Sequence, residues 1–234
     1  MALAGVIKPE IDLNIERVTV LIYGMPGLGK TTLASTAGDV LLIDADESAR
    51  RAALLDDAGQ RRCDVFTVRT WADVAGFTPG DFDDYSTVVV DTVGGLVDML
   101  AVQIAGGKSP SVRQWGEIKS TFGRWIDGLR SSGKDIVYIA HGVEKQVEDG
   151  DNRYTVMKPQ IAGSSLHTIT RQADLIGRLY ASGAGTVLSF NPALTGIGKN
   201  CARIPDSVVR NVADDAVMMQ KVISRTKEVM SSGQ

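Results

Sequence analysis

Nine residues near the start of the chain constrain its fold and chemistry more than any other stretch. They read Gly24-Met25-Pro26-Gly27-Leu28-Gly29-Lys30-Thr31-Thr32 and fit G-x-x-x-x-G-K-[ST], the pattern of a phosphate-binding loop. The apolar run 18–23 predicts a buried strand before the loop, and residues 31–37 predict a short helix after it. A glycine-rich turn could match this pattern by chance, but the strand and helix around it favour phosphate binding.

The residue types in the loop suit a polyphosphate that carries a magnesium ion. Glycines let successive backbone N–H groups point inward, and the N-terminus of the following helix adds a partial positive charge. Lys30 supplies a mobile cation to the outer phosphates, and the hydroxyl of Thr31 can bind Mg²⁺. The sequence therefore predicts a nucleoside triphosphate and Mg²⁺ as cofactors.

Three further apolar runs end in polar residues. They are 40–44, which ends in Asp44 and is followed by Asp46 and Glu47; 87–91, which ends in Asp91; and 135–141, which ends in His141. Open parallel sheets bind ligands at the carboxyl ends of their strands. We interpret Asp91 as the residue that holds the Mg²⁺ shell, although a plain strand terminus is the alternative. His141 could contact or sense a γ-phosphate, or be an ordinary strand-end histidine.

Strands that alternate with helices predict an α/β fold, here a three-layer α/β/α core with a mostly parallel sheet and antiparallel hairpin additions. Hairpins are expected at 143–158 and 174–190, where alternating residues flank turn-forming clusters. Helices are expected at 48–57, 70–74, 94–106, 115–130, 164–172 and 206–230. We expect residues 1–17 to form a surface arm, 18–205 the core, and 206–234 a helical segment with a disordered tail.

Composition narrows the class of protein further. A length of 234 residues suits one domain, and the net charge of −3 provides no overall basic field for nucleic acid. Any DNA binding must come from a local basic surface or from assembly of several subunits. The two cysteines and two histidines are scattered, which argues against a structural zinc site and fits a reducing cytoplasm. No apolar run approaches the roughly 20 residues of a membrane span, so no membrane partner is expected.

Three classes of phosphate-loop protein compete. A GTPase is suggested by residues 91–94, which fit D-x-x-G, but no N-K-x-D or T-K-x-D motif for reading guanine follows them. ATP is therefore the expected nucleotide. A small-molecule kinase would need an arginine-rich lid, and the hairpin at 143–158 contains only Arg153. The third class is the RecA-type ATPase, which assembles on DNA.

The order of the strand-end motifs carries a family resemblance. Ile43-Asp44-Ala45-Asp46, Val88-Val89-Val90-Asp91-Thr92-Val93 and Ile139-Ala140-His141 are similar to those of the RecA recombinase core. More closely, residues 18–205 resemble the short phage ATPases of the RecA-like, single-domain annealing recombinase type. The resemblance implies a RecA-like, DNA-stimulated ATPase that forms a filament or ring on single-stranded DNA, for recombination or annealing in the cytoplasm of a bacterial host. A single-strand binding protein is a further candidate partner.

The resemblance also implies roles for individual residues. The family has a catalytic glutamate two positions after the strand-end aspartate, where this chain has Asp46; because Glu47 is adjacent, either acid could be the base, or both could cap a helix. His141 lies where the family has its γ-phosphate sensor. The residues implied to contact DNA are Lys108, Arg113, Lys145, Arg153 and Lys158, and those implied to reach a neighbour's γ-phosphate are Lys199 and Arg203. A solvated hairpin and an ordinary surface loop are the alternatives.

A second function stays open from the sequence. The acidic net charge and the mixed charges of the hairpin also suit an ATP-switched assembly or loader factor with a protein partner. A small-molecule kinase is the weaker third option.

Overall fold

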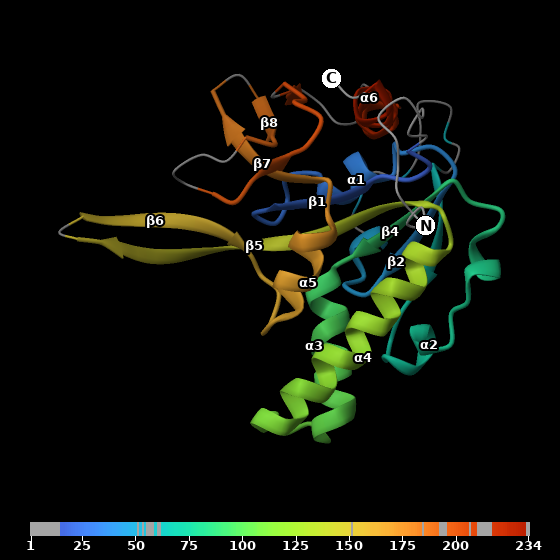
Figure 1. Ribbon diagram of the computed structural model, residues 1–234, viewed down its shortest axis with the longest axis vertical. Helices are drawn as coiled ribbons and strands as arrows, with labels where there is room; N and C mark the ends of the chain where they lie inside the picture. The colour runs from blue at the N-terminus through green and yellow to red at the C-terminus, as the bar shows by residue number, and fades with distance from the viewer. Residues whose placement is uncertain are drawn as a thin grey trace, which may run out of the picture.

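A computed structural model describes residues 15–50, 52, 54, 59, 62–150, 152–183, 185–191, 196–205, 207–209 and 217–232. A large sheet runs through the molecule in the order β10-β8-β7-β1-β5-β4-β2-β3, with β6 paired to β5 and β9 to β7 (Figure 1). The strands are β1 (Thr19–Gly24), β2 (Val40–Asp44), β3 (Cys63–Thr67), β4 (Thr87–Asp91), β5 (Asp135–Asp149), β6 (Asn152–Pro159), β7 (Leu175–Ser182), β8 (Gly185–Ser189), β9 (Lys199–Asn200) and β10 (Ser207–Val209). The helices are α1 (Lys30–Ala34), α2 (Ala72–Ala75), α3 (Val93–Ala105), α4 (Val112–Ser131), α5 (Ser165–Gln172), α6 (Met218–Ser232) and the 3₁₀ turns η1 (Ser48–Arg50) and η2 (Pro79–Phe82).

The central strands are parallel. β1 pairs with β5 and β7, β4 pairs with β5 and β2, and β2 pairs with β3, all in the same direction. β8 and β10 are added antiparallel at one edge. The predicted α/β fold with a mostly parallel sheet is confirmed. Because β5 lies between β1 and β4, the carboxyl ends of β1, β4 and β2 lie at one edge of the sheet beside His141, where β5 leaves the sheet.

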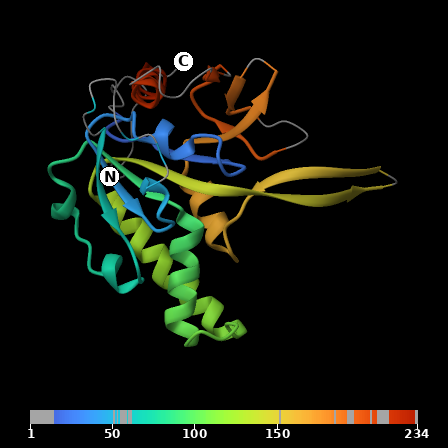
Figure 2. The same ribbon diagram turned by 180° about the vertical axis from the view of Figure 1, so that it is seen from behind.

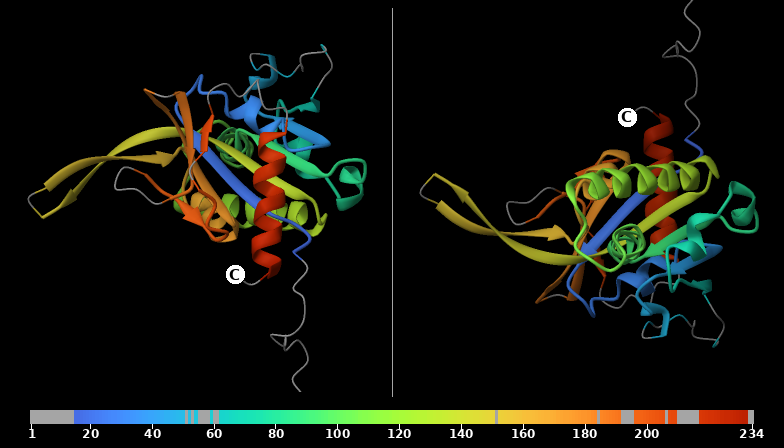
Figure 3. Two further views of the ribbon diagram at one scale, coloured as in Figure 1. Left: turned by 90° about the horizontal axis from the view of Figure 1, so that it is seen from above. Right: turned by 90° about the horizontal axis from the view of Figure 1, so that it is seen from below.

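Helices cover both faces of this sheet. In β1, Leu21 and Tyr23 pack into the core shared with α3, α4 and α5, whereas Val20 and Ile22 pack into the core shared with α1 and α6. Alternate side chains of a strand point to opposite faces, so a continuous apolar run is what a strand covered on both sides requires. Figure 3 shows α6 and α4 on opposite sides of the sheet.

The β5–β6 hairpin extends well beyond the sheet. β5 is one 15-residue strand that pairs with β1 and β4 in its first half and with β6 in its second. Figure 2 shows the two strands leaving the body as a twisted ribbon. The sequence predicts a strand and a separate hairpin here, and the structure joins them into one element.

The C-terminal part differs most from the prediction. Ser207–Val209 forms β10 against β8, where the sequence predicts helix, because a distant strand edge offers it backbone hydrogen bonds. The helix α6 begins at Met218, and residues 210–216 lie outside the described residues. Ser231 and Ser232 belong to α6, where the sequence predicts a disordered tail. β9 lies in the predicted loop 191–205.

Other predictions fall largely outside the described residues. Residues 1–14 of the expected arm are not described, nor are most residues of the expected helix 48–57 beyond the turn η1. Among the helices that the structure describes, none is long and apolar enough to cross a bilayer.

Candidate phosphate-binding site

The phosphate-binding loop connects β1 to α1, as the sequence predicts. Gly27 and Gly29 have φ angles of 80° and 81°, a region that side-chain-bearing residues rarely adopt. Gly29 is the N-cap of α1, and no side chain caps the helix. The backbone N–H groups at this end of the helix are therefore not occupied by a side-chain acceptor, which suits an anionic ligand.

Lys30 is buried at the floor of the loop. Its Nζ donates hydrogen bonds to the carbonyl oxygens of Gly24 and Met25, each at 2.9 Å. Burial lowers the pKa of Lys30, and the negative charges of Asp91 and Asp46 partly offset this shift. Within the described part of the chain, the hydrogen-bond acceptors of this ammonium are the two neutral carbonyls, and a phosphate oxygen is a stronger acceptor for it.

Asp91 lies at the end of β4, level with Asp44 at the end of β2. Its Oδ2 accepts a hydrogen bond from Thr31 Oγ1 at 2.5 Å and from Ser48 Oγ at 2.6 Å. Burial raises the pKa of Asp91, the two hydroxyl donors lower it, and the nearby Asp44 and Asp46 raise it further. A buried carboxylate beside a threonine hydroxyl fits Mg²⁺, a hard cation that prefers oxygen ligands and usually takes others from phosphates and water.

Asp44 organises the turn that follows β2. Its carboxylate accepts hydrogen bonds from the backbone N–H groups of Asp46 at 3.3 Å, Ser48 at 2.9 Å and Ala49 at 3.1 Å, and from Ser48 Oγ at 3.2 Å. The turn brings the Ser48 hydroxyl within hydrogen-bonding distance of Asp91. Ser48 is the site residue that the sequence reasoning missed, and a serine four positions after a strand-end aspartate is the signal that could have found it.

The two acids after β2 point to different places. Asp46 Oδ2 lies 3.0 Å from His141 Nε2, at the mouth of the loop. Glu47 has a φ of 50°, its carboxylate is exposed, and it lies 3.7 Å from a guanidinium nitrogen of Arg50. The structure therefore brings Asp46 and His141 to the phosphate-binding loop and directs Glu47 away from it.

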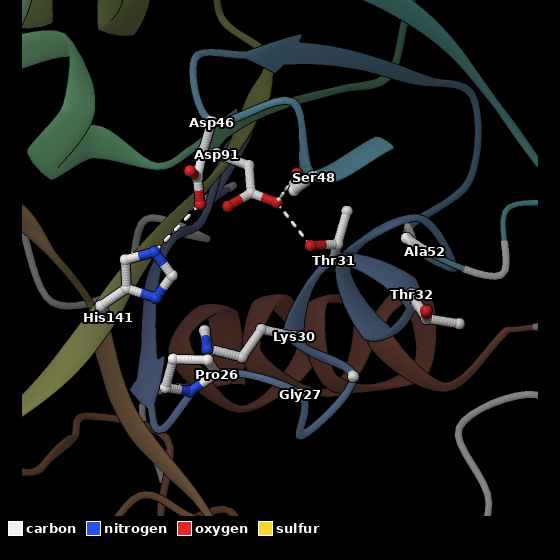
Figure 4. A pocket seen from close by; sticks show the side chains of 11 residues that line it. Pro26, Gly27, Lys30, Thr31, Thr32, Asp46, Ser48, Ala52, Asp91 and His141 are labelled. Atoms are coloured by element: carbon white, nitrogen blue, oxygen red, sulfur yellow. Dashed lines mark hydrogen bonds and ion pairs between the residues drawn. The ribbon is translucent and has the colours of Figure 1, made fainter. Parts of the chain in front are cut away.

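A single pocket of about 520 Å³ brings the loop residues together with Asp46, Ser48, Asp91 and His141 (Figure 4). Its lining consists of Pro26, Gly27, Gly29, Lys30, Thr31, Thr32, Asp46, Ser48, Ala52, Asp91 and His141. This volume lies within the range of small-molecule sites in proteins. Met25 and Leu28, which the motif includes, line a neighbouring pocket with β7 instead.

The candidate DNA-binding residues lie in two places. Lys108 and Arg113 are exposed at the turn between α3 and α4, and the others lie on the β5–β6 hairpin. Figure 1 shows the helical turn and the hairpin projecting in different directions. On the hairpin, Arg153 Nε lies 2.9 Å from Glu148 Oε1, so its charge already has a partner.

Lys199 and Arg203 border a hollow of about 450 Å³ that is separate from the phosphate pocket. Lys199 Nζ donates hydrogen bonds to the carbonyl oxygens of Arg171, at 3.5 Å, and Ala173, at the C-terminal end of α5. Arg203 is exposed and has a φ of 50°. The loop that carries Arg203 is closed by Asn200, whose side chain bonds the backbone N–H and carbonyl of Ile204 at 2.8 and 2.7 Å.

A strand–loop–helix phosphate site at the carboxyl edge of a parallel sheet defines the chain as a phosphate-loop α/β protein of the NTPase type. Residues 16–202 match the sequence model of a family described as an AAA domain, and the chain belongs to that family. No curated protein matches the chain. One solved structure that is similar to it is the crystal structure of the RadB recombinase, with 16% sequence identity, a TM-score of 0.43, and coverage of 75% of this chain and 83% of that one.

Proposed function

We propose that the chain is a Mg²⁺-dependent ATPase of RecA-like type that assembles as an oligomer on single-stranded DNA, in phage recombination or annealing. The meeting of Lys30, the Thr31–Asp91 pair and the Asp46–His141 pair in one pocket carries the ATPase part of the proposal, and assembly on single-stranded DNA is proposed from the family resemblance of the strand-end motifs. A cation, a metal-binding carboxylate and a second carboxylate at hydrogen-bonding distance from a histidine are the groups that hydrolysis of a phosphoanhydride needs.

Each residue has a distinct part in the reaction. Lys30 and the loop backbone would bind the phosphates, and Thr31 and Asp91 would hold a Mg²⁺ ion, which would supply positive charge to the phosphates. Asp46 accepts a proton from the water whose oxygen bonds to the γ-phosphorus as the bond to ADP breaks. His141 holds Asp46 in place and lies where a γ-phosphate would be sensed.

Hydrolysis by a Lys30→Ala variant tests the assignment of the site. We expect it to lose about 100-fold or more in rate, with a thermal unfolding curve that shows an intact fold. Full activity in this variant would mean that the loop is not the site.

The pair Asp46→Asn and Glu47→Gln tests which acid is the base. The structure supports Asp46, because Asp46 faces the pocket and Glu47 faces solvent. We expect a loss of about 10²- to 10⁴-fold for Asp46→Asn and near wild-type rates for Glu47→Gln. The reverse order would assign the base to Glu47.

DNA dependence is tested by ATP hydrolysis with and without single-stranded DNA, together with a DNA gel shift at low salt. Stimulation of ATP hydrolysis by single-stranded DNA, together with a shift of the DNA in the gel, supports the proposal. If neither occurs but ATP causes assembly, measured by light scattering, the chain is instead an ATP-switched factor that acts on a protein.

We further propose that Arg203 of a neighbouring subunit completes the phosphate site. The ammonium of Lys199 is already bonded to the end of α5, so we assign Lys199 to holding that loop and Arg203 to reaching the neighbour. A mixture of Lys30→Ala and Arg203→Ala proteins tests this, because in one of the two orders in which the variants can meet, the intact pocket of the Arg203→Ala protein faces the intact arginine of the Lys30→Ala protein. Activity of the mixture above the sum of its parts supports the role, and simple additivity contradicts it.

A further inference from the structure

The β5–β6 hairpin has two chemically different faces. Directly paired residues in an antiparallel ladder share a face, and the faces alternate along each strand. The first face contains the pairs Val143 with Lys158, Lys145 with Val156, Val147 with Tyr154 and, at the turn, Asp149 with Asn152. The second contains the pairs Glu144 with Met157, Gln146 with Thr155, and Glu148 with Arg153. We call the first set the lysine–tyrosine face and the second set the glutamate face.

Charge is sorted between these two faces. By register the lysine–tyrosine face has two cations and one acid, Asp149, which lies at its turn end, whereas the glutamate face has two acids and one cation. That one cation, Arg153, forms an ion pair with Glu148 on its own face. The lysine–tyrosine face therefore has a net positive charge and the glutamate face a net negative charge, so an anionic chain is favoured on the lysine–tyrosine face.

The lysine–tyrosine face also presents an aromatic ring. Tyr154 is 38% exposed, although it is a large and mostly apolar side chain, and it lies beside Val147 near the outer end of the ribbon. Lysines that neutralise phosphates, combined with an exposed ring on which a base can stack, are the two components of single-strand binding without sequence preference. A base in a duplex is already stacked and paired, so the ring favours an unpaired strand.

We propose that the lysine–tyrosine face is the surface of the hairpin that binds single-stranded nucleic acid, with Lys145 and Lys158 on the phosphates and Tyr154 stacked on a base. This inference rests on the proposed function, and it alters the set of candidate residues. Tyr154 is added to that set, and Arg153 leaves it because its charge is used within the glutamate face.

The test measures binding of a labelled single-stranded oligonucleotide to the full chain by fluorescence anisotropy. We expect Tyr154→Ala to weaken binding about 5- to 140-fold, and Tyr154→Phe to restore it, because the phenyl ring keeps the stacking surface. The double change of Lys145 and Lys158 to alanine should reduce the slope of log affinity against log salt by about 0.7 for each lysine removed.

Arg153→Ala is the matched control, because it removes one cation from the same ribbon but from the glutamate face. It should bind the oligonucleotide like the wild type, and thermal unfolding should show that every variant is folded. If Arg153→Ala loses affinity and the changes on the lysine–tyrosine face do not, the inference is wrong.

Two outcomes separate this inference from the function on which it rests. If the wild-type chain binds no single-stranded DNA at low salt, the proposed function fails and the inference fails with it. If the wild type binds DNA, and only changes of Lys108 and Arg113 weaken binding, then the DNA-binding function stands and the hairpin surface alone is overturned.

Discussion

Replacing Gly142 by alanine would probe the contact between β5 and the start of the phosphate-binding loop. A Cβ atom at position 142 would lie 3.0 Å from the carbonyl carbon of Gly24 and 3.2 Å from its Cα, and 2.8 Å from Met157 Sδ. The sulfur is at the end of a flexible side chain and can move aside. Gly24 is the last residue of β1: it pairs with His141 of β5 and directly follows Tyr23, which pairs with Arg178 of β7, so its backbone cannot move without disturbing the end of the ladder with β5.

The expected size of the effect follows from this geometry. Forcing a methyl group into a close-packed position destabilises a protein by about 1–3 kcal/mol. At about 2–4 °C per kcal/mol for a chain of this size, the melting temperature should fall by roughly 2–12 °C. Nucleotide affinity should fall as well, because the displaced Gly24 carbonyl accepts a hydrogen bond from Lys30.

Thermal unfolding with and without ATP and Mg²⁺ measures both effects, since a ligand that binds only the folded state raises the melting temperature. Gly123→Ala in α4 is the control: it has no heavy atom within 4 Å of the added Cβ, and replacing a helical glycine should stabilise by about 0.5–1 kcal/mol. A Gly142→Ala protein with wild-type melting temperature and wild-type nucleotide affinity would refute the close-contact argument.

Three further predictions concern single groups. Ser48→Ala should lower the free energy of unfolding by about 1.5–3 kcal/mol, measured in urea, because a buried carboxylate loses a donor; Ser48→Thr should restore it. Burial raises the pKa of Asp91, so the native state binds a proton at this carboxyl more readily than the unfolded chain does. The fold therefore loses stability as the pH rises from the pKa of the unfolded chain through the higher pKa of the native state. Without ligand, the Asp91→Asn protein should therefore have a higher melting temperature than wild type at neutral pH, and this difference should shrink in acid. ATP and Mg²⁺ should no longer raise the melting temperature of the variant. Thr36→Ala should lose about 1 kcal/mol in thermal unfolding, because its hydroxyl accepts from the Met219 N–H at the start of α6.

Patterns that are local in the sequence predicted most of the sheet and the centre of the site. The run 40–44 matches β2 residue for residue, and the strand ends predicted the approach of Asp91 to Thr31. These predictions succeed because strands buried on both faces are apolar throughout. Their carboxyl ends are where open parallel sheets bind ligands, so polar side chains follow there.

Features that depend on distant partners were out of reach. The position of Ser48 depends on how the turn wraps around Asp44, and the ion pair of Arg153 depends on the register of two strands. β10 has no local signal at all, because its hydrogen bonds come from β8. Which of Asp46 and Glu47 faces the pocket likewise depends on the backbone of the turn, in which Glu47 adopts a left-handed conformation.

The placement of β1 in the sheet has a consequence for how the chain folds. Its two neighbours, β5 and β7, come far later in the sequence, as the pairings of Val20 with Val137 and with Leu175 show. Contacts between residues so distant along the chain form slowly, because a long loop must close before they contribute. During synthesis the phosphate-binding loop is made before β5 and β7, so its strand lacks both of these partners until β5 emerges. The candidate phosphate site is therefore completed only after β5 has been made, and a fragment that ends before β5 should have no working loop.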